Sequence, residues 1–501
     1  MASVYLTFDL GTTALKAALI AEDGRLVGHA VREYAPRMPA PGQATMDPEE
    51  YWRALVEGTR QVLAGDPSFA GRVRTIGFSS QGQTFVALGE NGQPLCEALI
   101  WLDNRATREA EDWGRDWLGR DEFRLSSGYP WLAPGLSVFK IAWLREHLPA
   151  AHQAWKFLWL PDYLIYRLSG ETATDPVIAR MGGLFDQRSQ DWHPGLLAAC
   201  GIQAGQLPVV LPGGAVAGRL LPGPAAELGL PPGLAVCTGT NDQLAGALGV
   251  GNVRAGVVSE TTGTALAVIT SLPGWLDDEG LVVGRHAVPG LYYAMTYANT
   301  SAVLLTWFRE LCGQSGLAYA DFLREAAAIP AGSEGLTVLP HFMGTPPPQG
   351  DSSARGAILG LSLSHTRAHL ARAILEACAC LLRACLEPLA AHGLAAERVH
   401  SLGGAARSDL WLQIKADLLG LPVERPECQA AASLGAAMLA GVGTGQFASL
   451  EDAAAAWYRP AAVFGPDPAA QGAYAELYQR YQHFSRLVYG ETRLPRTPAA
   501  A

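Results

Sequence analysis

The chain has 501 residues, more than one hydrophobic core usually supports, so we expect two domains of about 200–250 residues each. Hydrophobic residues make up 49% and charged residues 17% of the sequence, which is typical of a folded globular protein and excludes a disordered one. The formal net charge of −10 argues against nucleic acid or an anionic membrane as the main partner.

Signals for secretion and membrane insertion are also missing from the sequence. No positively charged segment precedes an apolar stretch, and no run approaches the ~18 apolar residues of a membrane span. Cys378, Cys380 and Cys385 lie in an apolar helical pattern without metal-ligand spacing, which favours core packing over a metal or redox role. We therefore expect a cytoplasmic protein.

A β-meander with a polar first turn begins the chain. Strand patterns cover residues 4–8, a second apolar run that ends at 20, and residues 25–27. The turn after the first strand holds Asp9, Gly11, Thr12 and Thr13. Its glycine lets the backbone approach an anion, its hydroxyls can donate hydrogen bonds, and its carboxylate can hold a hydrated Mg²⁺. So short a turn also joins ordinary hairpins, and that alternative stays open.

Polar side chains follow two further segments of the first half. A helix capped by Asp47 should run from Pro48 to residue 63, and a strand covers residues 75–78. Gln81, Gly82 and Gln83 follow that strand, where they could contact a substrate or form a satisfied turn.

Further along, Trp101, Asp103 and Arg105 alternate, which in an extended segment places all three on one face. Such a face suits a polyhydroxyl ligand. The alternative is an internal Asp–Arg pair under a tryptophan.

One carboxylate stands at a strand-to-helix junction in the middle of the chain. An apolar run ends at Cys237, small residues form a turn, and Asp242 begins an apolar helix pattern. Ligands of α/β proteins bind at such junctions. After a glycine-rich connection, residues 261–264 offer backbone amides that could face a phosphate. A candidate general base and a candidate phosphate turn thus lie on either side of a hinge expected near residues 248–256.

The two halves of the chain share a short sequence. Residues 11–17, Gly-Thr-Thr-Ala-Leu-Lys-Ala, are similar to residues 262–267, Thr-Gly-Thr-Ala-Leu-Ala, close to half the chain away. The second half continues with helix patterns over 300–311, 322–328 and 369–391 and strand patterns over 336–340 and 398–402. The repeat predicts a duplicated nucleotide-binding architecture.

Two longer motifs resemble the signatures of the FGGY carbohydrate kinases. Residues 135–147 are similar to the first signature, and residues 356–376 to the second. With Asp9-Leu10-Gly11-Thr12, Trp101-x-Asp103-x-Arg105, Asp242 and the Gly403-Gly404 turn, the resemblance covers residues 4–440 in the family's order. It implies two RNase H-like α/β domains of the actin, hexokinase and Hsp70 ATPase type, with ATP and sugar in the cleft between them.

The resemblance also implies a role for individual residues. Asp242 would accept a proton from the sugar hydroxyl, and Asp9 and Asp242 would lie near Mg²⁺. Gln81, Gly82, Gln83, Trp101, Asp103 and Asp242 would bind the sugar. The expected nucleotide contacts are Gly11, Thr12, Thr13, Lys16, Thr262, Gly263, Thr264, Gly403, Gly404 and Ser408.

Within the family, the layout is most similar to xylulokinases, so a pentulose such as D-xylulose is the expected substrate. Two departures keep gluconate, ribulose, a hexulose or a pentitol open. Gly82-Gln83 stands where xylulokinases typically have Met-His and glycerol kinases Arg-Glu, and Gly344 is followed by Thr345-Pro346 in place of Glu-Arg. Rival functions are an actin- or Hsp70-like ATPase and a non-catalytic sugar sensor.

The expected domains are a sugar-binding domain over residues 1–250, a nucleotide-binding domain over 251–445, and a helical segment with a frayed tail over 446–501. A small-molecule sugar is the expected partner. The sequence leaves a homodimer open.

Overall fold

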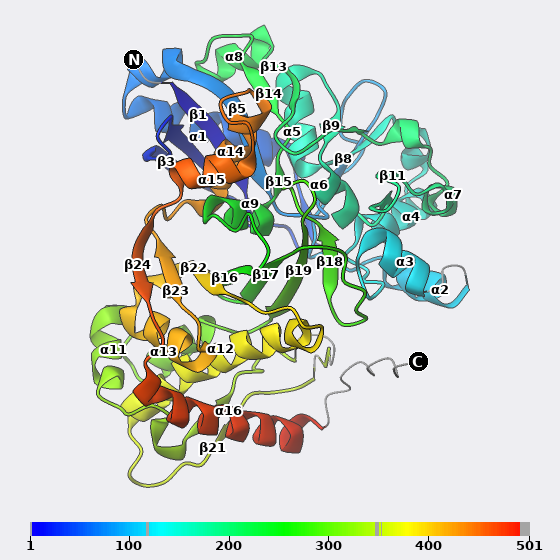
Figure 1. Cartoon of the computed structure of the whole chain (residues 1–501). Helices are drawn as coiled ribbons and strands as arrows, with labels where there is room; N and C mark the ends of the chain where they lie inside the picture. Colours follow the sequence, from blue (N-terminus) through cyan, green and yellow to red (C-terminus); the bar gives the residue numbers. More distant parts are fainter. Residues whose placement is uncertain (1–2, 117–119, 346–349, 352, 491–501) are drawn as a thin grey trace.

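The computed structural model describes residues 3–116, 120–345, 350, 351 and 353–490. Two large mixed sheets form the centres of two domains (Figure 1). The predicted frayed tail falls largely on residues 491–501, and the loop after Thr345 on residues 346–349; both lie outside the described residues.

The first sheet is built around the N-terminal meander. Its strands are β1 (Val4–Leu10), β2 (Ala14–Ala21), β3 (Leu26–Glu33), β5 (Val73–Ser80), β13 (Val216–Arg219), β14 (Ala235–Cys237) and β15 (Thr240–Asn241). β1 pairs antiparallel with β2 and parallel with β5, and β14 continues the parallel part. Every residue of β1 is buried, because helices cover both faces of the sheet.

The second sheet repeats this pairing pattern. Its strands are β16 (Val257–Thr262), β17 (Leu266–Leu272), β18 (Val282–Arg285), β19 (Tyr292–Ala298), β22 (Arg398–Leu402), β23 (Val423–Pro426) and β24 (Pro460–Phe464). β16 pairs antiparallel with β17 and parallel with β22, as β1 does with β2 and β5. The two halves predicted from the repeated sequence therefore share a topology as well.

Helices and small sheets complete the first domain. Asp47 caps α1 by accepting a hydrogen bond from the Glu49 amide, as expected, and α1 packs against the meander. The helices are α1 (Pro48–Ala64), α2 (Thr107–Asp116), α3 (Arg120–Ser127), α4 (Ser137–His147), α5 (Leu160–Ser169), α6 (Pro176–Met181), α7 (Pro194–Cys200), α8 (Pro222–Leu228) and α9 (Asp242–Gly249). The short strands are β4 (Thr45–Met46), β6 (Phe85–Leu88), β7 (Ala98–Leu99), β8 (Lys156–Trp159), β9 (Ala173–Thr174), β10 (Phe185–Asp186), β11 (Asp191–Trp192) and β12 (Val209–Val210).

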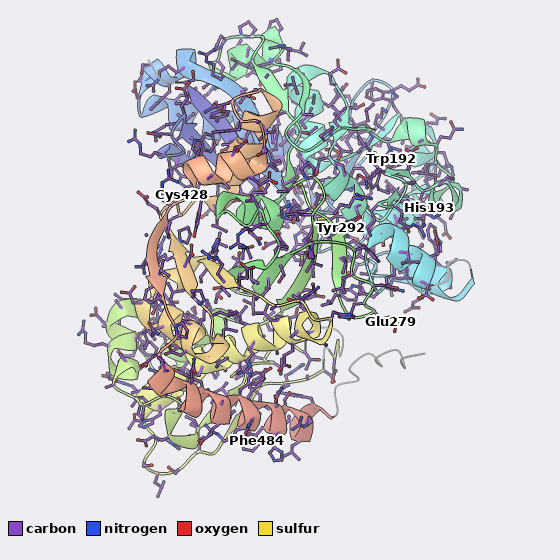
Figure 2. All side chains as sticks on the ribbon, viewed as in Figure 1. Trp192, His193, Glu279, Tyr292, Cys428 and Phe484 are labelled. Atoms are coloured by element: carbon purple, nitrogen blue, oxygen red, sulfur yellow. The ribbon has the colours of Figure 1, made fainter. Side chains whose placement is uncertain are left out.

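The second domain places a helical layer on one face of its sheet, where Phe484 lies at the outer side of the domain (Figure 2). Its elements are α10 (Val303–Leu311), α11 (Tyr319–Ala327), α12 (Arg367–Ala391), α13 (Asp409–Leu419), α16 (Pro468–Tyr489) and the strand pair β20 (Thr337–Leu339) and β21 (Ala357–Leu359). The cysteines of α12 are buried and free, in keeping with the expected core packing.

The C-terminal boundaries differ from the expected ones. α14 (Ala431–Gly443) and α15 (Leu450–Trp457) pack on the first sheet beside Tyr5 and Ile20. The end of the expected nucleotide-binding domain and the start of the expected C-terminal segment therefore return to the first domain. β24 and α16 then belong to the second domain, by pairing with β23 and packing on α12 and α13. The described part of the expected C-terminal segment, residues 446–490, is therefore divided between the two domains.

Two helices cross between the sheets with their main chains in contact. A methyl group on Gly249 of α9 would overlap the Ala431 carbonyl oxygen of α14, and one on Gly435 of α14 would overlap the Ala245 carbonyl oxygen of α9. Apolar residues of α9 also pack against Ile269 of the second sheet. α9 is thus shared by both domains, and the chain leaves it at the expected hinge (Figure 1).

Candidate active site

A carboxylate and two partners lie at the carboxyl end of β1. Asp9 is 6% exposed and accepts hydrogen bonds from Ser79 Oγ at 2.9 Å and from Lys16 Nζ at 2.9 Å. Asp9 lies opposite Lys16 across the β1–β2 pair and opposite Ser79 across β1–β5, so strand register alone brings the three together. The lysine side chain remains half exposed on the solvent side.

Asp242 adds a second carboxylate to the same region. It is the first residue of α9, after the N-cap Asn241, and its Oδ1 accepts hydrogen bonds from Asn241 Nδ2 at 2.9 Å and the Gln243 amide at 2.8 Å. Burial, followed by the nearby charge of Asp9, raises the pKa of Asp242 to about 7. A carboxyl group with that pKa can accept a proton at neutral pH.

The donor set suits a divalent cation. Two carboxylates that raise each other's electrostatic energy gain from a shared positive charge, and oxygen ligands are those that Mg²⁺ prefers. The hydrogen bonds of Asp242 engage Oδ1, and the structure records none to Oδ2 among the described residues. Asp9 and Asp242 therefore fit the expected Mg²⁺ region.

The first phosphate turn is fixed through the Gly11 carbonyl oxygen. Tyr34 Oη donates to it at 2.7 Å and Gln81 Nε2 at 3.0 Å, while the Gly11 amide donates to the Ala14 carbonyl at 3.0 Å. Within the described chain, the amides of Thr12 and Thr13 have no backbone partner. The amide donors that this turn leaves free of a backbone partner are therefore those of Thr12 and Thr13, whereas the Gly11 amide is already bonded.

The second turn is also closed by a hydrogen bond from the amide of its glycine. The Gly263 amide donates to the Ala265 carbonyl at 3.0 Å, and the Gly263 and Thr264 carbonyls accept from the amides of Ala302 and Ser301. Thr264 is exposed, whereas the Thr262 side chain is 1% exposed and hydrogen-bonded inside the domain. Thr262 thus supports the turn from beneath and offers no free hydroxyl to a ligand.

Gly403 and Gly404 lie beside this second turn. Gly403 has a φ of 79°, and a methyl group on it would approach the Thr262 carbonyl oxygen to 2.9 Å, so glycine is needed there. Gly404 is exposed with open space beside its Cα. Ser408 was expected to contact the nucleotide. Its hydroxyl oxygen caps α13 by accepting a hydrogen bond from the Trp411 amide.

The expected sugar contacts Gln81, Gly82, Gln83 and Trp101 lie next to the first turn, and we call them the sugar wall. Trp101 is 41% exposed, and its Nε1 donates to Thr12 Oγ1 at 2.8 Å. Gln83 has a φ of 62°, which is rare for a residue with a side chain, and its Nε2 donates to Tyr129 Oη at 3.0 Å. Gly82 is buried against Met181, and Gln81 is 5% exposed, so neither presents a side chain to the surface.

Buried groups that sequence reasoning missed hold this wall. Lys140 Nζ donates to the carbonyls of Gln83 at 3.0 Å and Ile100 at 2.8 Å, and burial lowers its pKa to about 7. Ser137 Oγ donates to the same Gln83 carbonyl at 2.9 Å. A lysine inside the apolar first signature was a signal for Lys140; nothing local marked Tyr34 or Tyr129.

Asp103 does not present its carboxylate to a ligand. Trp101 and Leu102 form a turn, so the extended segment with three groups on one face is wrong. Asp103 is fully buried and accepts hydrogen bonds from the Arg105 guanidinium and the Ala44 amide. The internal Asp–Arg pair is therefore the interpretation that fits, although Arg105 stacks over Trp143 and not over Trp101.

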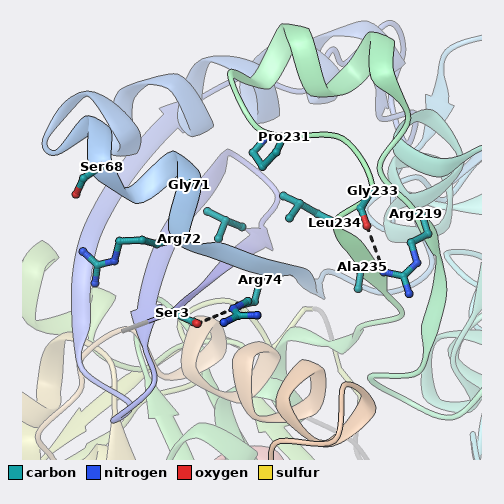
Figure 3. Close-up of a pocket in the computed structure, with 11 residues that line it drawn as sticks. Ser3, Ser68, Gly71, Arg72, Arg74, Arg219, Pro231, Gly233, Leu234 and Ala235 are labelled. Atoms are coloured by element: carbon teal, nitrogen blue, oxygen red, sulfur yellow. Dashed lines mark hydrogen bonds between the residues drawn. The ribbon is translucent and has the colours of Figure 1, made fainter. Parts of the chain in front are cut away.

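A separate hollow of about 740 Å³ lies at the opposite end of the first sheet (Figure 3). It is lined by residues at the starts of β5 and β14 and at the end of β13. Two of them are Arg74 of β5 and Arg219 of β13, whose side chains donate hydrogen bonds to Ser3 Oγ and to the Gly233 carbonyl. β5 spans Val73–Ser80, and eight strand residues extend about 25 Å, so this hollow is remote from Asp9 and Asp242.

Across the described ranges, no helix has the length and apolar character to cross a membrane.

Comparison with known proteins places these features in context. Residues 4–249 match the N-terminal domain, and residues 257–444 the C-terminal domain, of the FGGY family of carbohydrate kinases. A xylulose kinase from Lactococcus lactis is 31% identical over 479 residues, 95% of each chain. A glycerol kinase from Bordetella parapertussis is 30% identical over 477 residues, 90% of this chain and 91% of the relative.

A solved structure supports the same grouping. The crystal structure of xylulose kinase from Rhodospirillum rubrum is similar with a TM-score of 0.87 at 30% identity, over 97% of this chain and 98% of the other. The predicted α/β fold with two sheet-based domains is confirmed by this likeness.

Proposed function

Because this chain belongs to the FGGY family of carbohydrate kinases, we propose that it phosphorylates a pentulose, D-xylulose first, with ATP as the donor. The observation that carries the proposal is Asp242, a carboxylate at the start of α9 with a pKa of about 7. It lies beside Asp9, with which it interacts electrostatically, and the wall that holds Gln83 and Trp101 meets the first phosphate turn at Thr12.

Asp242 serves as the general base in the proposed reaction. As the sugar hydroxyl oxygen bonds to the γ-phosphorus, its proton passes to Asp242 Oδ2, and the bond to the β–γ bridging oxygen breaks so that ADP leaves with the electron pair. Mg²⁺ held near Asp9 and Asp242 would supply charge neutralisation for the phosphates. Lys16 and the amides of Thr12 and Thr264 add positive charge and donors around the transferred group.

The sugar wall supports a five-carbon open-chain substrate. The side chain of Gln83 offers an amide that can both donate and accept hydrogen bonds. The main-chain carbonyl of Gln83 is fixed by Lys140 and Ser137, so this side chain projects from a rigid loop. Gly82 contributes no side chain of its own and is covered by Met181, and the Arg-Glu pair of glycerol kinases is absent. A single amide at Gln83 suits a pentulose or pentitol and predicts looser discrimination than a Met-His pair.

A panel of sugars with coupled detection of ADP tests the proposal. Purified protein with ATP and Mg²⁺ is assayed with xylulose, ribulose, xylitol, gluconate, a hexulose and glycerol, with Asp242→Asn as the inactive control. We expect the highest kcat/KM with D-xylulose. Turnover of gluconate or a hexulose without any pentulose or pentitol would sink the substrate proposal and leave the kinase.

The same assay separates the rival functions. An actin- or Hsp70-like ATPase would release ADP at a rate that no sugar changes. A sugar sensor would bind a sugar in calorimetry and release no ADP with any acceptor.

A further inference from the structure

A second acid–serine–lysine cluster is buried beneath the second phosphate turn. Lys415 Nζ, from α13, lies 2.5 Å from Glu260 Oε1 and donates to Thr262 Oγ1 at 3.0 Å and Ser401 Oγ at 3.2 Å. Thr262 and Ser401 each donate to Glu260 as well. Glu260 is fully buried and Lys415 is 1% exposed, so this is a closed network.

This cluster repeats the Asp9 cluster of the first domain. Asp9 lies opposite Ser79 across the parallel pair β1–β5, and Glu260 lies opposite Ser401 across the parallel pair β16–β22. In both domains the serine hydroxyl donates to the acid, and a lysine completes the ion pair. The lysines differ in origin, since Lys16 comes from the adjacent strand and Lys415 from a helix.

The two copies also differ in their access to ligands. Asp9 and Lys16 face the region of Asp242, and the Lys16 side chain is half exposed. Lys415 instead closes the second acid off inside the domain, so Glu260 cannot serve a ligand as Asp9 can. The second cluster must therefore act through the residues that it holds.

Those residues form the base of the expected nucleotide site. Thr262 is the last residue of β16, directly before Gly263, and its carbonyl lies against Gly403. Ser401 precedes the Gly403-Gly404 turn by two residues. One ammonium group thus ties together β16, β22 and α13 at the point where both turns leave the sheet.

We propose that Lys415 is a positioning residue for the phosphoryl donor: with Glu260 it fixes the 262–264 turn against the 403–404 turn, so that both meet the nucleotide in one geometry. This inference rests on the proposed function, because it takes ATP as the ligand of these turns. It assigns Lys415 no contact with the substrate itself.

The test must separate positioning from loss of folding. Removing one member of a buried ion pair leaves an uncompensated charge and destabilises strongly, whereas neutralising both members is much milder. The probing variant is therefore Lys415→Met with Glu260→Gln. A matched control exists in the same domain, where Arg372 bonds Glu376 at 2.9 Å and Tyr474 Oη at 2.6 Å, away from both turns.

The experiment is titration calorimetry of the full chain with ATP and, separately, with the accepted sugar. We expect Lys415→Met/Glu260→Gln to weaken ATP binding about tenfold and to leave sugar affinity within about twofold. The control Arg372→Met/Glu376→Gln should leave both affinities unchanged at a similar loss of thermal stability. Thr262→Val removes one hydroxyl of the network and should weaken ATP binding by a smaller factor, about threefold.

Each result decides the proposal. The proposal would be overturned if Lys415→Met/Glu260→Gln bound ATP as tightly as the wild type. It would also be overturned if the control variant lost as much ATP affinity as the probing variant. If circular dichroism shows that the double variant does not fold, Thr262→Val decides alone, and unchanged ATP affinity there overturns it. Wild-type protein that binds no ATP would instead refute the proposed function.

Discussion

Replacing Asp242 by Asn tests the proposed base by its activity and by its titration. The amide keeps the shape of the side chain but cannot accept the proton of the sugar hydroxyl. Turnover at saturating sugar should fall at least about a hundredfold, while ATP binding persists. In the wild type, kcat/KM should rise with pH and level off above about 7, because Asp242 must be ionised to act.

Ionisation of Asp242 should also lower the free energy of unfolding as the pH rises. Its pKa of about 7 lies above the ordinary value of about 3.9, so the folded protein binds this proton more tightly than the unfolded chain does. The stabilisation is complete below about pH 4 and is lost as the pH rises to about 7. Between pH 5 and pH 8 the wild type should therefore lose about 3 kcal/mol that Asp242→Asn does not lose.

Urea unfolding of both proteins at pH 5 and pH 8, followed by circular dichroism, measures this difference. The variant should gain on the wild type as the pH rises, so that a catalytic loss accompanies a gain in stability. A stability difference that does not change between the two pH values would show that Asp242 titrates at its ordinary pKa. Near-normal turnover of the variant would remove Asp242 from the mechanism.

Three further outcomes follow from the site. Gly263→Val should fold, because a Cβ there would meet the Ala265 carbonyl oxygen only at 3.9 Å and the φ of Gly263 is ordinary. The isopropyl group should nevertheless obstruct the phosphate turn and weaken ATP binding in calorimetry while sugar binding survives. The reverse pattern would mean that the nucleotide contacts and the sugar contacts are assigned backwards. Gln83→Ala and Gln83→Gly should each lower kcat/KM for the sugar about tenfold or more, with little change in apparent ATP affinity. Glycine relieves the backbone strain at a φ of 62°, so a loss of kcat/KM in Gln83→Ala alone would mean that the backbone, and not the amide, causes the effect. Sugar and nucleotide together should reduce the radius of gyration in small-angle scattering by closing the domains about residues 248–256, and an unchanged radius under saturating ligands would count against a cleft-closing enzyme.

Local signals predicted the elements of this fold well. The meander, the capped helix that begins at Pro48 and the strand over 398–402 follow from apolar periodicity, an N-cap and turn residues, which act over a few positions. The repeated turns at Gly11 and Gly263 gave the duplication, because the same short sequence recurs at the same place in both sheets.

Contacts between distant segments were beyond the reach of the sequence. α14 is apolar on nearly all sides, so no face of it indicates that it returns to the first sheet. Alternation at Trp101, Asp103 and Arg105 suggested one exposed face, but the energy of a buried, fully bonded Asp103 outweighs that pattern and turns the chain. The contact of Ser79 with Asp9 arises from the pairing of β1 with β5.

The contact of α9 with α14 has a consequence for how this protein can vary. Where side chains meet, an interface can be adjusted one methylene at a time, at about 1 kcal/mol per step. At Gly249 and Gly435 the partners are main-chain atoms, and even alanine would overlap a carbonyl oxygen of the facing helix. A substitution there must move a whole helix, and α9 begins with Asp242. Substitutions therefore cannot adjust the contact of α9 with α14 gradually: a variant either keeps both glycines or moves Asp242.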